Sequence, residues 1–391
     1  RNILKSLKCR CEREKLPGFE VINSKERQAI SKLFNEGGVL IAHGLESKRK
    51  KFHVREFENN CSKYFKSSYC LAVSSGTAAI KIGLKALGVK PGDEVITQAF
   101  NFIATIEAIL DCGAKPIMAN VDNSLNMCPL SLQKLITKKT KVILPVHMLG
   151  VAAKMNEIIK IAKKNSIKVL EDNCETVGGK YNNSYLGTIG DIGIFSFDYG
   201  KMITTGEGGM VLTNKRNLDK FCREYHDHGH QNNPKYPRGK DTKEIFGFNY
   251  RMTEMQGVIG KVQLTKLKKM IIENKKRYNI LNNSLIRKFK IREIPIQSNG
   301  TYDTFIFFVN NKKIKLKILD ILYSSGVGTK NLPDAMEWHC SYYWDHALPK
   351  KQIINSNFTR ELLDTAIAVP IWLSKNLNIY KEIAKNISKI L

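Results

Sequence analysis

Long apolar runs are missing from this chain of 391 residues, and their absence limits where the protein can work. A membrane-spanning helix needs about 20 consecutive, mostly apolar residues, and no stretch approaches that length. The opening segment, RNILKSLKCRCEREK, also lacks the apolar core of a secretory signal peptide. We therefore expect a cytoplasmic protein that does not insert into a membrane.

Regular cysteine spacing is missing as well. The nine cysteines are odd in number, lie scattered along the chain and form no C-x-x-C pair. Disulfide frameworks and structural zinc sites both depend on such spacing. The histidine-rich run at 226–230, HDHGH, has no further cysteine or carboxylate at a defined distance that would support a metal site. The sequence predicts free thiols in a reducing compartment and no bound metal.

Acidic residues are scarce relative to basic ones. The chain has 36 Asp and Glu against 63 Lys and Arg, a net charge of +27. Such an excess suggests nucleic acid, a membrane surface or acidic small molecules as partners. The basic residues are spread along the chain, however, and the densest run, SKRKK at 47–51, has no aromatic residues interleaved with it. A solvated loop is the better interpretation of that run, and we expect no nucleic-acid partner.

Short apolar runs alternate with helical patterns through the first two thirds of the chain, which is typical of βαβ units on a mainly parallel sheet. The predicted strands are 70–73, 94–97, 116–121, 141–146, 168–170, 192–197 and 210–212. The predicted helices between them are 77–87, 102–110, 130–136, 154–164 and 217–225. The pattern therefore predicts an α/β fold, in which ligands bind beyond the carboxyl ends of the strands.

The remaining patterns suggest three parts. Residues 1–16 form a basic lead, and residues 17–275 form a large domain. Two predicted helices open this domain: one has Ser24 as its N-cap, and the other spans 54–65. A long helix over 251–275 bridges to a small α+β domain, 276–391. Its predicted strands are 288–294 and 304–309, and its predicted helices are 313–322 and 380–391.

The most informative stretch is DIGIFSFDYGKMITTGEGGM at 191–210. A β-like apolar segment is followed by Lys201 and then by a cluster of glycines, so the lysine lies just past a strand end. Burial lowers the pKa of a lysine and makes it a nucleophilic amine suited to Schiff-base chemistry. A surface lysine in a glycine-rich loop is the plainer alternative, and only the surrounding motifs separate the two.

Two further motifs fall at predicted strand ends. The run Ser74-Ser75-Gly76-Thr77 follows one strand and opens a helix, a place where backbone N–H groups bind anions such as phosphate. Asp172 follows the strand 168–170 and needs a cationic partner there. An ordinary turn and a capping acid are the alternatives for these two motifs.

The run from Ser196-Phe197 through Lys201 to Thr204-Thr205-Gly206-Glu207-Gly208-Gly209 resembles the signature of the DegT/StrS-type sugar aminotransferases. The resemblance covers nearly the whole chain from Pro17 onward. It implies an aspartate-aminotransferase-like fold of type I, with a large α/β domain and a smaller C-terminal domain. It also implies pyridoxal 5'-phosphate as cofactor, glutamate as amino donor and a homodimer with shared active sites.

The resemblance further implies a role for each matching residue. Lys201 would carry the cofactor and act as catalytic base, and Asp172 would pair with the ring nitrogen. The other cofactor contacts would be Gly76, Thr77 and Ser196 at the phosphate, Phe102 stacked on the ring, Glu175 near the ring 3-oxygen, and Asn249 from the neighbouring subunit. By sequence alone, a core aromatic is the better interpretation of Phe102. Asp198 departs from the histidine common at that position.

Substrate contacts are implied for His228, which lies in a turn resembling the family's N-H-G, and for His339, which equally fits a structural histidine. The runs PGFE at 17–20, VREFE at 54–58, SFDYGK at 196–201, DHGH at 227–230 and NLPDA at 331–335 most resemble the branch that makes 8-amino-3,8-dideoxy-octulosonate, an acidic sugar of the bacterial cell surface. Its carboxylate would need a guanidinium. Arg55, Arg238 and Arg251 are the candidates.

Two alternatives to the octulosonate substrate remain open from the sequence. Most members of the family aminate nucleotide-linked 3-keto or 4-keto hexoses, whose phosphates would also bind arginine. A non-catalytic basic regulatory protein on the same fold is the other possibility, although such a protein would have no need to retain Asp172 and Lys201 together.

Overall fold

The computed structural model describes residues 17–349 and 357–390, so the predicted basic lead at 1–16 lies outside the described residues. The largest sheet has seven strands in the spatial order β1 (Tyr69–Val73), β9 (Gly209–Thr213), β8 (Ile192–Ser196), β5 (Lys168–Asp172), β4 (Thr140–Ile143), β2 (Glu94–Gln98) and β3 (Lys115–Ala119). Strand β9 is antiparallel to both of its neighbours, and the other strands pair in parallel. The expected α/β fold with a mainly parallel sheet is confirmed.

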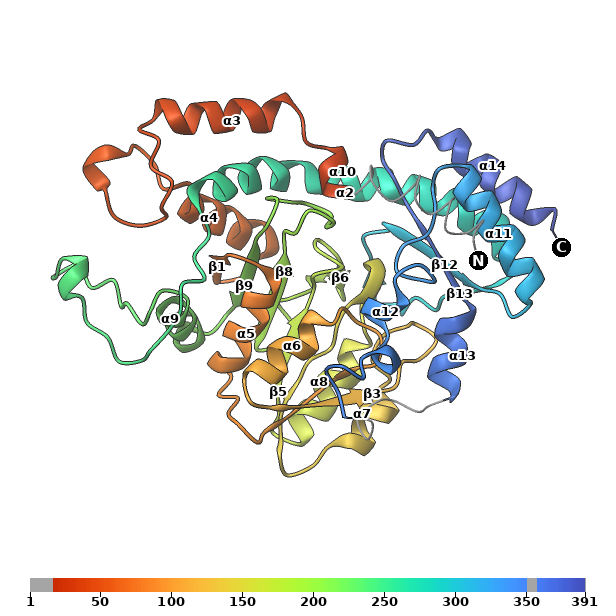
Figure 1. Ribbon diagram of the computed structural model, residues 1–391, viewed down its shortest axis with the longest axis horizontal. Coiled ribbons are helices and arrows are strands. Elements are labelled where there is room, and N and C mark those ends of the chain that lie inside the picture. Colours follow the sequence, from red (N-terminus) through yellow and green to blue (C-terminus); the bar gives the residue numbers. More distant parts are fainter. Residues whose placement is uncertain (1–16, 350–356, 391) are drawn as a thin grey trace.

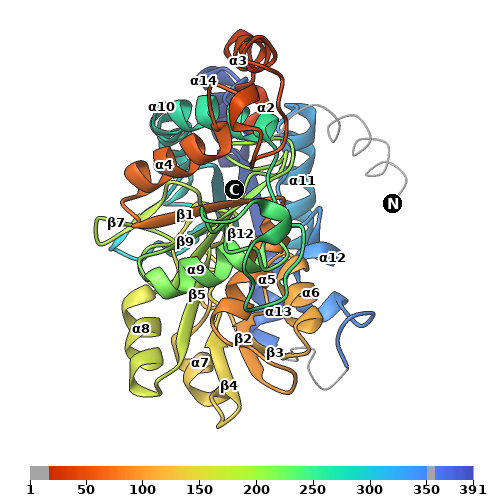
Figure 2. The same ribbon diagram turned by 90° about the vertical axis from the view of Figure 1, so that its left-hand side faces the viewer.

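Helices cover both faces of this sheet (Figure 2), because consecutive side chains of a strand point to opposite faces. Ile192 and Ile194 of β8 pack in the core beneath helix α5, whereas Phe195 packs in the core beneath helix α4. The helices around the sheet are α4 (His53–Phe65), α5 (Gly76–Ala86), α6 (Ala104–Asp111), α7 (Pro129–Leu135), α8 (Met155–Lys164) and α9 (Arg216–Tyr225). Their positions agree with the predicted ones to within a few residues.

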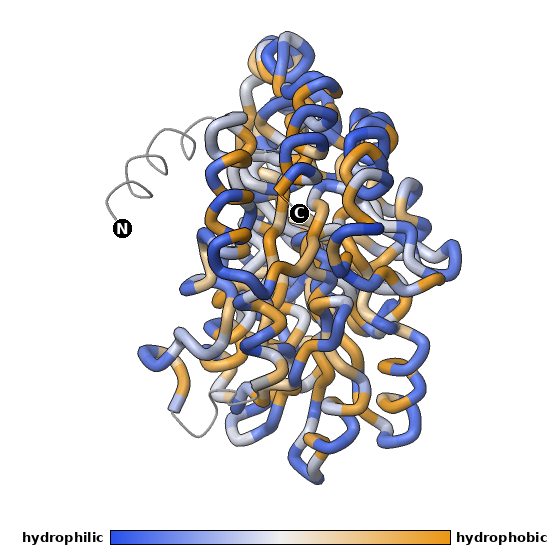
Figure 3. Tube along the Cα trace, turned by 90° about the vertical axis from the view of Figure 1, so that its right-hand side faces the viewer, coloured by the Kyte–Doolittle hydropathy of each residue, from blue (hydrophilic) through white to orange (hydrophobic). Residues whose placement is uncertain are grey.

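A second, antiparallel sheet consists of β10 (Lys290–Ile291), β12 (Thr304–Phe308) and β13 (Ala366–Pro370). The helices α11 (Lys312–Ser324), α13 (Asn357–Thr365) and α14 (Leu377–Ser388) accompany it. In Figure 3 the outer helices alternate between hydrophilic and hydrophobic positions, as expected of helices that bury one face. Strand β13 and helix α13 were not predicted, because a short apolar run such as AIAVP carries no periodicity that would distinguish a strand from a loop.

Helix α10 (Glu254–Leu285) runs across the top of the molecule in Figure 1 and packs against α3 (Ser24–Asn35), α4 and α14. It begins with Thr253 as N-cap, whose side chain accepts a hydrogen bond from the backbone of Gln256. The prediction ended this helix at Lys275. The helix continues because Tyr278, Leu281 and Leu285 are buried in the core of the second sheet.

A few details complete the fold. Asn23, and not Ser24 as predicted, is the N-cap of α3, since its side chain accepts a hydrogen bond from the backbone N–H of Lys25. The short elements are α2 (Pro17–Glu20), α12 (Met336–His339), the 3₁₀ helices η1 (Glu46–Lys48), η2 (Met148–Gly150), η3 (Arg238–Lys240) and η4 (Ser341–Tyr343), and a small sheet of β6 (Lys180–Tyr181), β7 (Ser184–Tyr185) and β11 (Ser298–Asn299). Within residues 17–349 and 357–390, the helices are too short or too polar to span a membrane.

Candidate active site

A cavity of about 410 Å³ opens beyond the carboxyl ends of β5 and β8, where the topology predicts a ligand site. Its size is within the range typical of small-molecule pockets. The sequence-predicted residues that line it are Gly76, Thr77, Phe102, Asp172, Glu175, Ser196, Lys201 and His339. Residues far apart in the chain thus meet in one place, and eight of the thirteen predicted site residues lie together.

The loop that carries Lys201 is folded tightly back on itself. The backbone N–H of Thr205 donates to the carbonyl of Phe197, and the N–H of Phe197 donates to the carbonyl of Gly208. A Cβ at position 208 would lie 2.4 Å from Thr205 Oγ1, so a side chain does not fit there. Gly208, one glycine of the cluster recognised in the sequence, is therefore required by the loop that presents Lys201 to the cavity.

Lys201 forms a short ion pair, with Nζ 2.5 Å from Glu175 Oε1. Burial by itself would lower the pKa of Lys201, but Glu175, together with Cys174 and Asp198, outweighs burial and raises it. The expected lowered pKa is therefore wrong for the chain without a ligand, in which Lys201 is an ammonium group.

Asp172 is the last residue of β5 and is almost completely buried. Its Oδ1 accepts a hydrogen bond from the backbone N–H of Cys174 at 3.0 Å, and its Oδ2 accepts one from Thr105 Oγ1 at 3.2 Å. Burial raises the pKa of Asp172. Burial favours the neutral acid form of Asp172, and a cation next to it would favour the ionised carboxylate instead. The site therefore suits a ligand with a protonated nitrogen.

The first turn of α5 forms another wall of the cavity. Ser75 is the N-cap and accepts a hydrogen bond from Ala78 N at 3.1 Å. The amide groups of a first helical turn have no acceptor within the helix and bind anions. A Cβ at position 76 would lie 2.8 Å from Ser196 Cβ, so Gly76 lets the helix approach the end of β8 closely. Ser196, Thr77 and the first-turn amides together suit a phosphate.

Two further observations of the structure indicate that these groups fit pyridoxal 5'-phosphate. Glu175 Oε2 is buried without a hydrogen-bond partner among the described residues, so it is available to a ligand. Phe102 is 43% exposed and lines the cavity, with its ring 5.3 Å from that of His339, which argues against the core-packing interpretation of Phe102. A lysine past a strand end, an acid opposite it and an anion site at a helix N-terminus define a pyridoxal-phosphate enzyme of fold type I.

Comparison with known proteins narrows this class. The sequence profile of the DegT/DnrJ/EryC1/StrS aminotransferase family matches residues 44–388, and the chain belongs to this family. The family is the one that the sequence motifs indicated, and its cofactor is pyridoxal 5'-phosphate. The expectation of a pyridoxal-phosphate-dependent sugar aminotransferase family is therefore confirmed.

Individual relatives agree with this assignment. The chain is 37% identical over 242 residues to the GDP-perosamine synthase of Escherichia coli O157:H7, a match that covers 61% of this chain and 65% of that protein. It is 32% identical over 282 residues to the pleiotropic regulatory protein of Geobacillus stearothermophilus, covering 71% of this chain and 73% of that protein. The match thus spans less than two thirds of the Escherichia coli protein.

Solved structures resemble the whole chain. The aminotransferase from Psychrobacter cryohalolentis superimposes with a TM-score of 0.85 at 26% identity, covering 96% of this chain and 98% of that one. The 3-amino-5-hydroxybenzoic acid synthase superimposes with a TM-score of 0.80 at 22% identity, covering 97% and 98%, and supports the fold alone.

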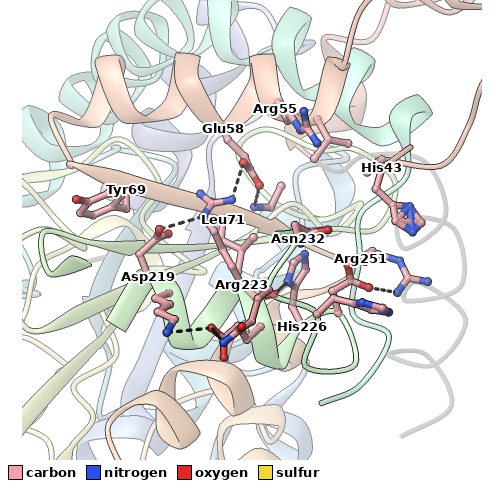
Figure 4. A pocket seen from close by; sticks show the side chains of 18 of the residues that line it. His43, Arg55, Glu58, Tyr69, Leu71, Asp219, Arg223, His226, Asn232 and Arg251 are labelled. Carbon is pink, nitrogen blue, oxygen red and sulfur yellow. Dashed lines mark hydrogen bonds and ion pairs between the residues drawn. The ribbon is translucent and has the colours of Figure 1, made fainter. Parts of the chain in front are cut away.

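The other predicted residues, Arg55, His228, Arg238, Asn249 and Arg251, do not line the Lys201 cavity. Arg55 and Arg251 line a larger cavity of about 1080 Å³ between α4, α9 and the loop after α9 (Figure 4). Arg251 Nη1 lies 2.6 Å from Asp227 Oδ1, and Arg238 donates two hydrogen bonds to the same carboxylate. His228 is exposed. Within one chain, the expected substrate arginines are therefore apart from Lys201.

The backbone next to Arg251 explains this separation. Arg251 pairs with Val73 at the end of β1, and Ser74 N donates to the carbonyl of Tyr250. The segment thus runs beside the anion-binding turn, but its arginine side chain lies with Asp227 in the larger cavity. The two guanidinium groups lower the pKa of Asp227 to about 2 against the effect of burial, which would raise it.

Sequence reasoning missed several residues that line the Lys201 cavity, among them the polar residues Thr105, Lys330 and Asn331. Thr105 lies in α6 and reaches Asp172 across the cavity. Lys330 and Asn331 lie in the segment after α11 and reach the cavity only through the packing of the second sheet against the first. No local pattern gave them a role, although Asn331 opens the run NLPDA that carried part of the resemblance and Lys330 directly precedes it.

Proposed function

We propose that this chain transfers an amino group from glutamate to a keto or aldehydo sugar, with pyridoxal 5'-phosphate bound at Lys201. The observation that carries the proposal is the ion pair of Lys201 with Glu175 inside the cavity that also contains Asp172 and the first turn of α5. An ordinary loop lysine would be exposed to water, whereas the side chain of Lys201 is only 17% exposed.

Each residue then has a role that follows from its position. The cofactor supplies an electron sink for the bond changes at the amino carbon. Asp172 would keep the ring nitrogen protonated, and Ser196 with Thr77 and the first-turn amides of α5 would hold the phosphate. Lys201, once freed from the cofactor, would move the proton between carbon atoms as a general base. Phe102 would limit the tilt of the ring by stacking on it.

Spectroscopy and labelling test this proposal. The protein should show the yellow colour of the bound cofactor, and glutamate should bleach it. After borohydride reduction, peptide mapping should find the phosphopyridoxyl group on Lys201. Label on a different lysine, or a protein that stays colourless when the cofactor is added, would contradict the proposal and would favour a regulatory role, the role named for the Geobacillus relative.

For the acceptor, we propose the 8-oxo form of 3-deoxy-octulosonate, an acidic eight-carbon sugar of the bacterial surface. Its support is the set of sequence runs quoted above, since the charge of the cavity alone does not distinguish acidic acceptors. A nucleotide-linked keto-hexose is the second candidate, because two relatives are named GDP-perosamine synthase and UDP-N-acetyl-3-dehydro-alpha-D-glucosamine 3-aminotransferase. A glutamate-dependent assay that offers both acceptor classes decides between them. Turnover of the nucleotide-linked sugar alone would refute the octulosonate acceptor.

We further propose a homodimer in which each chain completes the other's site. Among the described residues that line the Lys201 cavity, the carboxylates are Asp172, Glu175, Asp198 and Glu207, and the lysines are Lys201 and Lys330, without an arginine. A phosphate and an acidic acceptor need more positive charge than this. Asn249 and Arg251 lie on a segment beside large exposed aromatic side chains, Phe246 and Phe248, which suits a protein interface.

Mixing variants tests the shared site. Lys201→Ala and Arg251→Ala should each be inactive alone, and the mixture should regain part of the activity, because an isologous hybrid dimer contains one intact site. A mixture that exchanges subunits, as shown by mass spectrometry, yet stays inactive would contradict the shared site.

A further inference from the structure

Three charged side chains of alternating sign lie in one wall of the Lys201 cavity, and a fourth, Asp303, pairs with the last of them. Lys201 Nζ lies 2.5 Å from Glu175 Oε1, Lys330 Nζ lies 3.6 Å from Glu175 Oε2, and Lys330 Nζ lies 2.7 Å from Asp303 Oδ2. We call this series the ionic chain. Its first two members follow strands of the seven-stranded sheet, and its last two flank the second sheet.

The ionic chain is largely shielded from water. The side chain of Glu175 is 7% exposed and that of Asp303 is 1% exposed. Burial alone would raise the pKa of Glu175, but Lys201 and Lys330 together lower it to about 2. Glu175 is therefore ionised at neutral pH and depends on two cations, since a buried carboxylate without a cation is strongly unfavourable.

A bound cofactor would take hydrogen-bond donors away from Glu175. If Lys201 Nζ bonded to the aldehyde carbon with loss of water, its ammonium group with three N–H donors would become an imine nitrogen with at most one. Lys330 is then the one remaining lysine among the described residues that line the cavity. His339 does not replace it: Nδ1 of His339 lies 2.8 Å from the carbonyl of Ala335, and burial lowers the pKa of this histidine.

Lys330 is itself fixed in place. Its backbone N–H donates to the carbonyl of Ala368 in β13, and its side chain donates to Asp303. Asp303 in turn accepts a hydrogen bond from Thr301 Oγ1 at 2.7 Å. Opposite, Glu175 Oε2 has no hydrogen-bond partner among the described residues, so the oxygen nearest Lys330 is open to a ligand.

We propose that Lys330, anchored by Asp303, is a positioning residue of the cofactor site, which keeps Glu175 ionised and fixed when Lys201 is bound to the cofactor. This inference rests on the proposed function. Lys330 acts through Glu175 and forms no bond with the reacting atoms.

The test measures the dissociation constant of pyridoxal 5'-phosphate by its absorbance, from pH 5.5 to 9, for wild type and Lys330→Met. Loss of a buried cation should weaken cofactor binding about 10-fold or more. The ratio of the two dissociation constants should increase with pH, because Glu175 without Lys330 is tolerated as the neutral acid and disfavoured as the anion. Lys330→Arg should restore binding in part.

A double variant shows whether the effect passes through Glu175. In a Glu175→Gln background, Lys330→Met should change the dissociation constant by less than about 3-fold and should lose the dependence on pH, because the interaction of the two residues is gone. Lys315→Met is the matched control: this half-buried lysine of α11 bonds to the carbonyl of Ala366 at 3.3 Å and does not line the cavity.

The outcomes separate this inference from the proposed function. Borohydride labelling of Lys201 in wild type tests the proposed function by itself. With that label present, an unchanged dissociation constant in Lys330→Met, or an equal loss with and without Glu175→Gln, would overturn the role of Lys330. Should Lys330→Met melt below the assay temperature, Lys330→Gln, which keeps a donor for Asp303, is measured in its place with the same two expectations.

Discussion

Two basic residues, the buried Arg292 and the half-buried Lys330, connect the second sheet to the loops of the first, and they do so in opposite ways. Arg292, next to β10, donates hydrogen bonds to the carbonyls of Ser124, Met148 and Leu149 at 2.6, 2.8 and 3.1 Å. Lys330, after α11, instead contacts the carboxylates of Asp303 and Glu175. We call the contacts of Arg292 with neutral carbonyl groups the neutral junction, and the contacts of Lys330 with the two carboxylates the ionic junction.

The two junctions also differ in whether their charged groups use all of their hydrogen-bonding atoms. Arg292 is 4% exposed, and its guanidinium group donates to buried backbone carbonyls, of which Met148 also accepts a hydrogen bond from Val151 N. The ionic chain leaves Glu175 Oε2 without a hydrogen bond from any residue that the structure describes. A buried charge with fully used partners serves the fold, whereas a buried charge with a free oxygen at a cavity is prepared for a ligand. The hydrogen bonds of the two charged groups thus distinguish a residue that supports the fold from a residue that belongs to the site.

Breaking the ionic junction at its reactive end should have the largest effect. Lys201→Ala removes the amine that binds the cofactor and moves the proton, so we expect activity to fall by about 1,000-fold or more. The measurement is glutamate-dependent turnover, together with borohydride labelling, which should find no modified lysine. Lys215→Ala, an exposed lysine beyond β9, is the control and should keep both activity and label. Retained turnover in Lys201→Ala would contradict the assignment.

Breaking the neutral junction should reduce stability and spare the chemistry. Arg292→Met removes the side-chain donor from the carbonyls of Ser124 and Leu149, whereas Met148 keeps its bond from Val151 N, at a cost of about 3 kcal/mol in the free energy of unfolding. Urea denaturation measures this loss. Below the melting temperature, the cofactor dissociation constant should stay unchanged, because Arg292 does not line the cavity. A cofactor affinity that falls together with stability would remove the distinction between the two junctions.

Acid should weaken the ionic junction alone. The folded-state pKa of Glu175 is about 2 against an ordinary value of 4.5, so its ionised form stabilises the fold above pH 4.5. That stabilisation is lost as the pH falls toward 2, by about 2 kcal/mol between pH 5 and pH 3. Unfolding of the cofactor-free protein at several pH values should therefore show a steeper acid loss in wild type than in Glu175→Gln. Parallel curves for the two proteins would contradict the ionised state of Glu175.

A single glycine lies against both junctions and should show the smallest effect. Gly150 has φ +79°, and a Cβ there would lie 2.4 Å from Asp303 Oδ1. Gly150→Ala should cost about 1 to 2 kcal/mol in the free energy of unfolding, from the left-handed backbone and the contact with Asp303. Gly92→Ala, also at positive φ but with open space around it, is the control for backbone strain alone. Equal losses in both variants would show that Asp303 does not constrain position 150.

Much of the fold could be predicted from the sequence because local patterns carry it. The seven strands of the large sheet follow from short β-branched runs between turns, and Asp172 and Lys201 follow strand ends that meet at one edge of the sheet. The long helix ended ten residues too early in the prediction because ENKKR at 273–277 looks solvated, although Tyr278 beyond it is buried.

The remainder depends on tertiary packing. Lys330 and Asp303 have no recognisable spacing relative to Glu175, and their contacts exist only after the second sheet has packed on the first. The raised pKa of Lys201 likewise follows from its ion pair, which local sequence does not specify. The pairing of Arg238 and Arg251 with Asp227 could not be foreseen either, because the loop that joins them has no regular pattern.

Strand β12 has a consequence for how the molecule comes apart. Its alternate side chains belong to two different cores: Ile306 and Phe308 pack with the large sheet, whereas Phe305 and Phe307 pack beneath α11 and α14. Pulling either layer away exposes aromatic surface on the same five residues. Because β12 contributes side chains to both cores, heat should unfold both layers in a single cooperative step. A protease cut between α10 and β10 should leave the two fragments bound to each other.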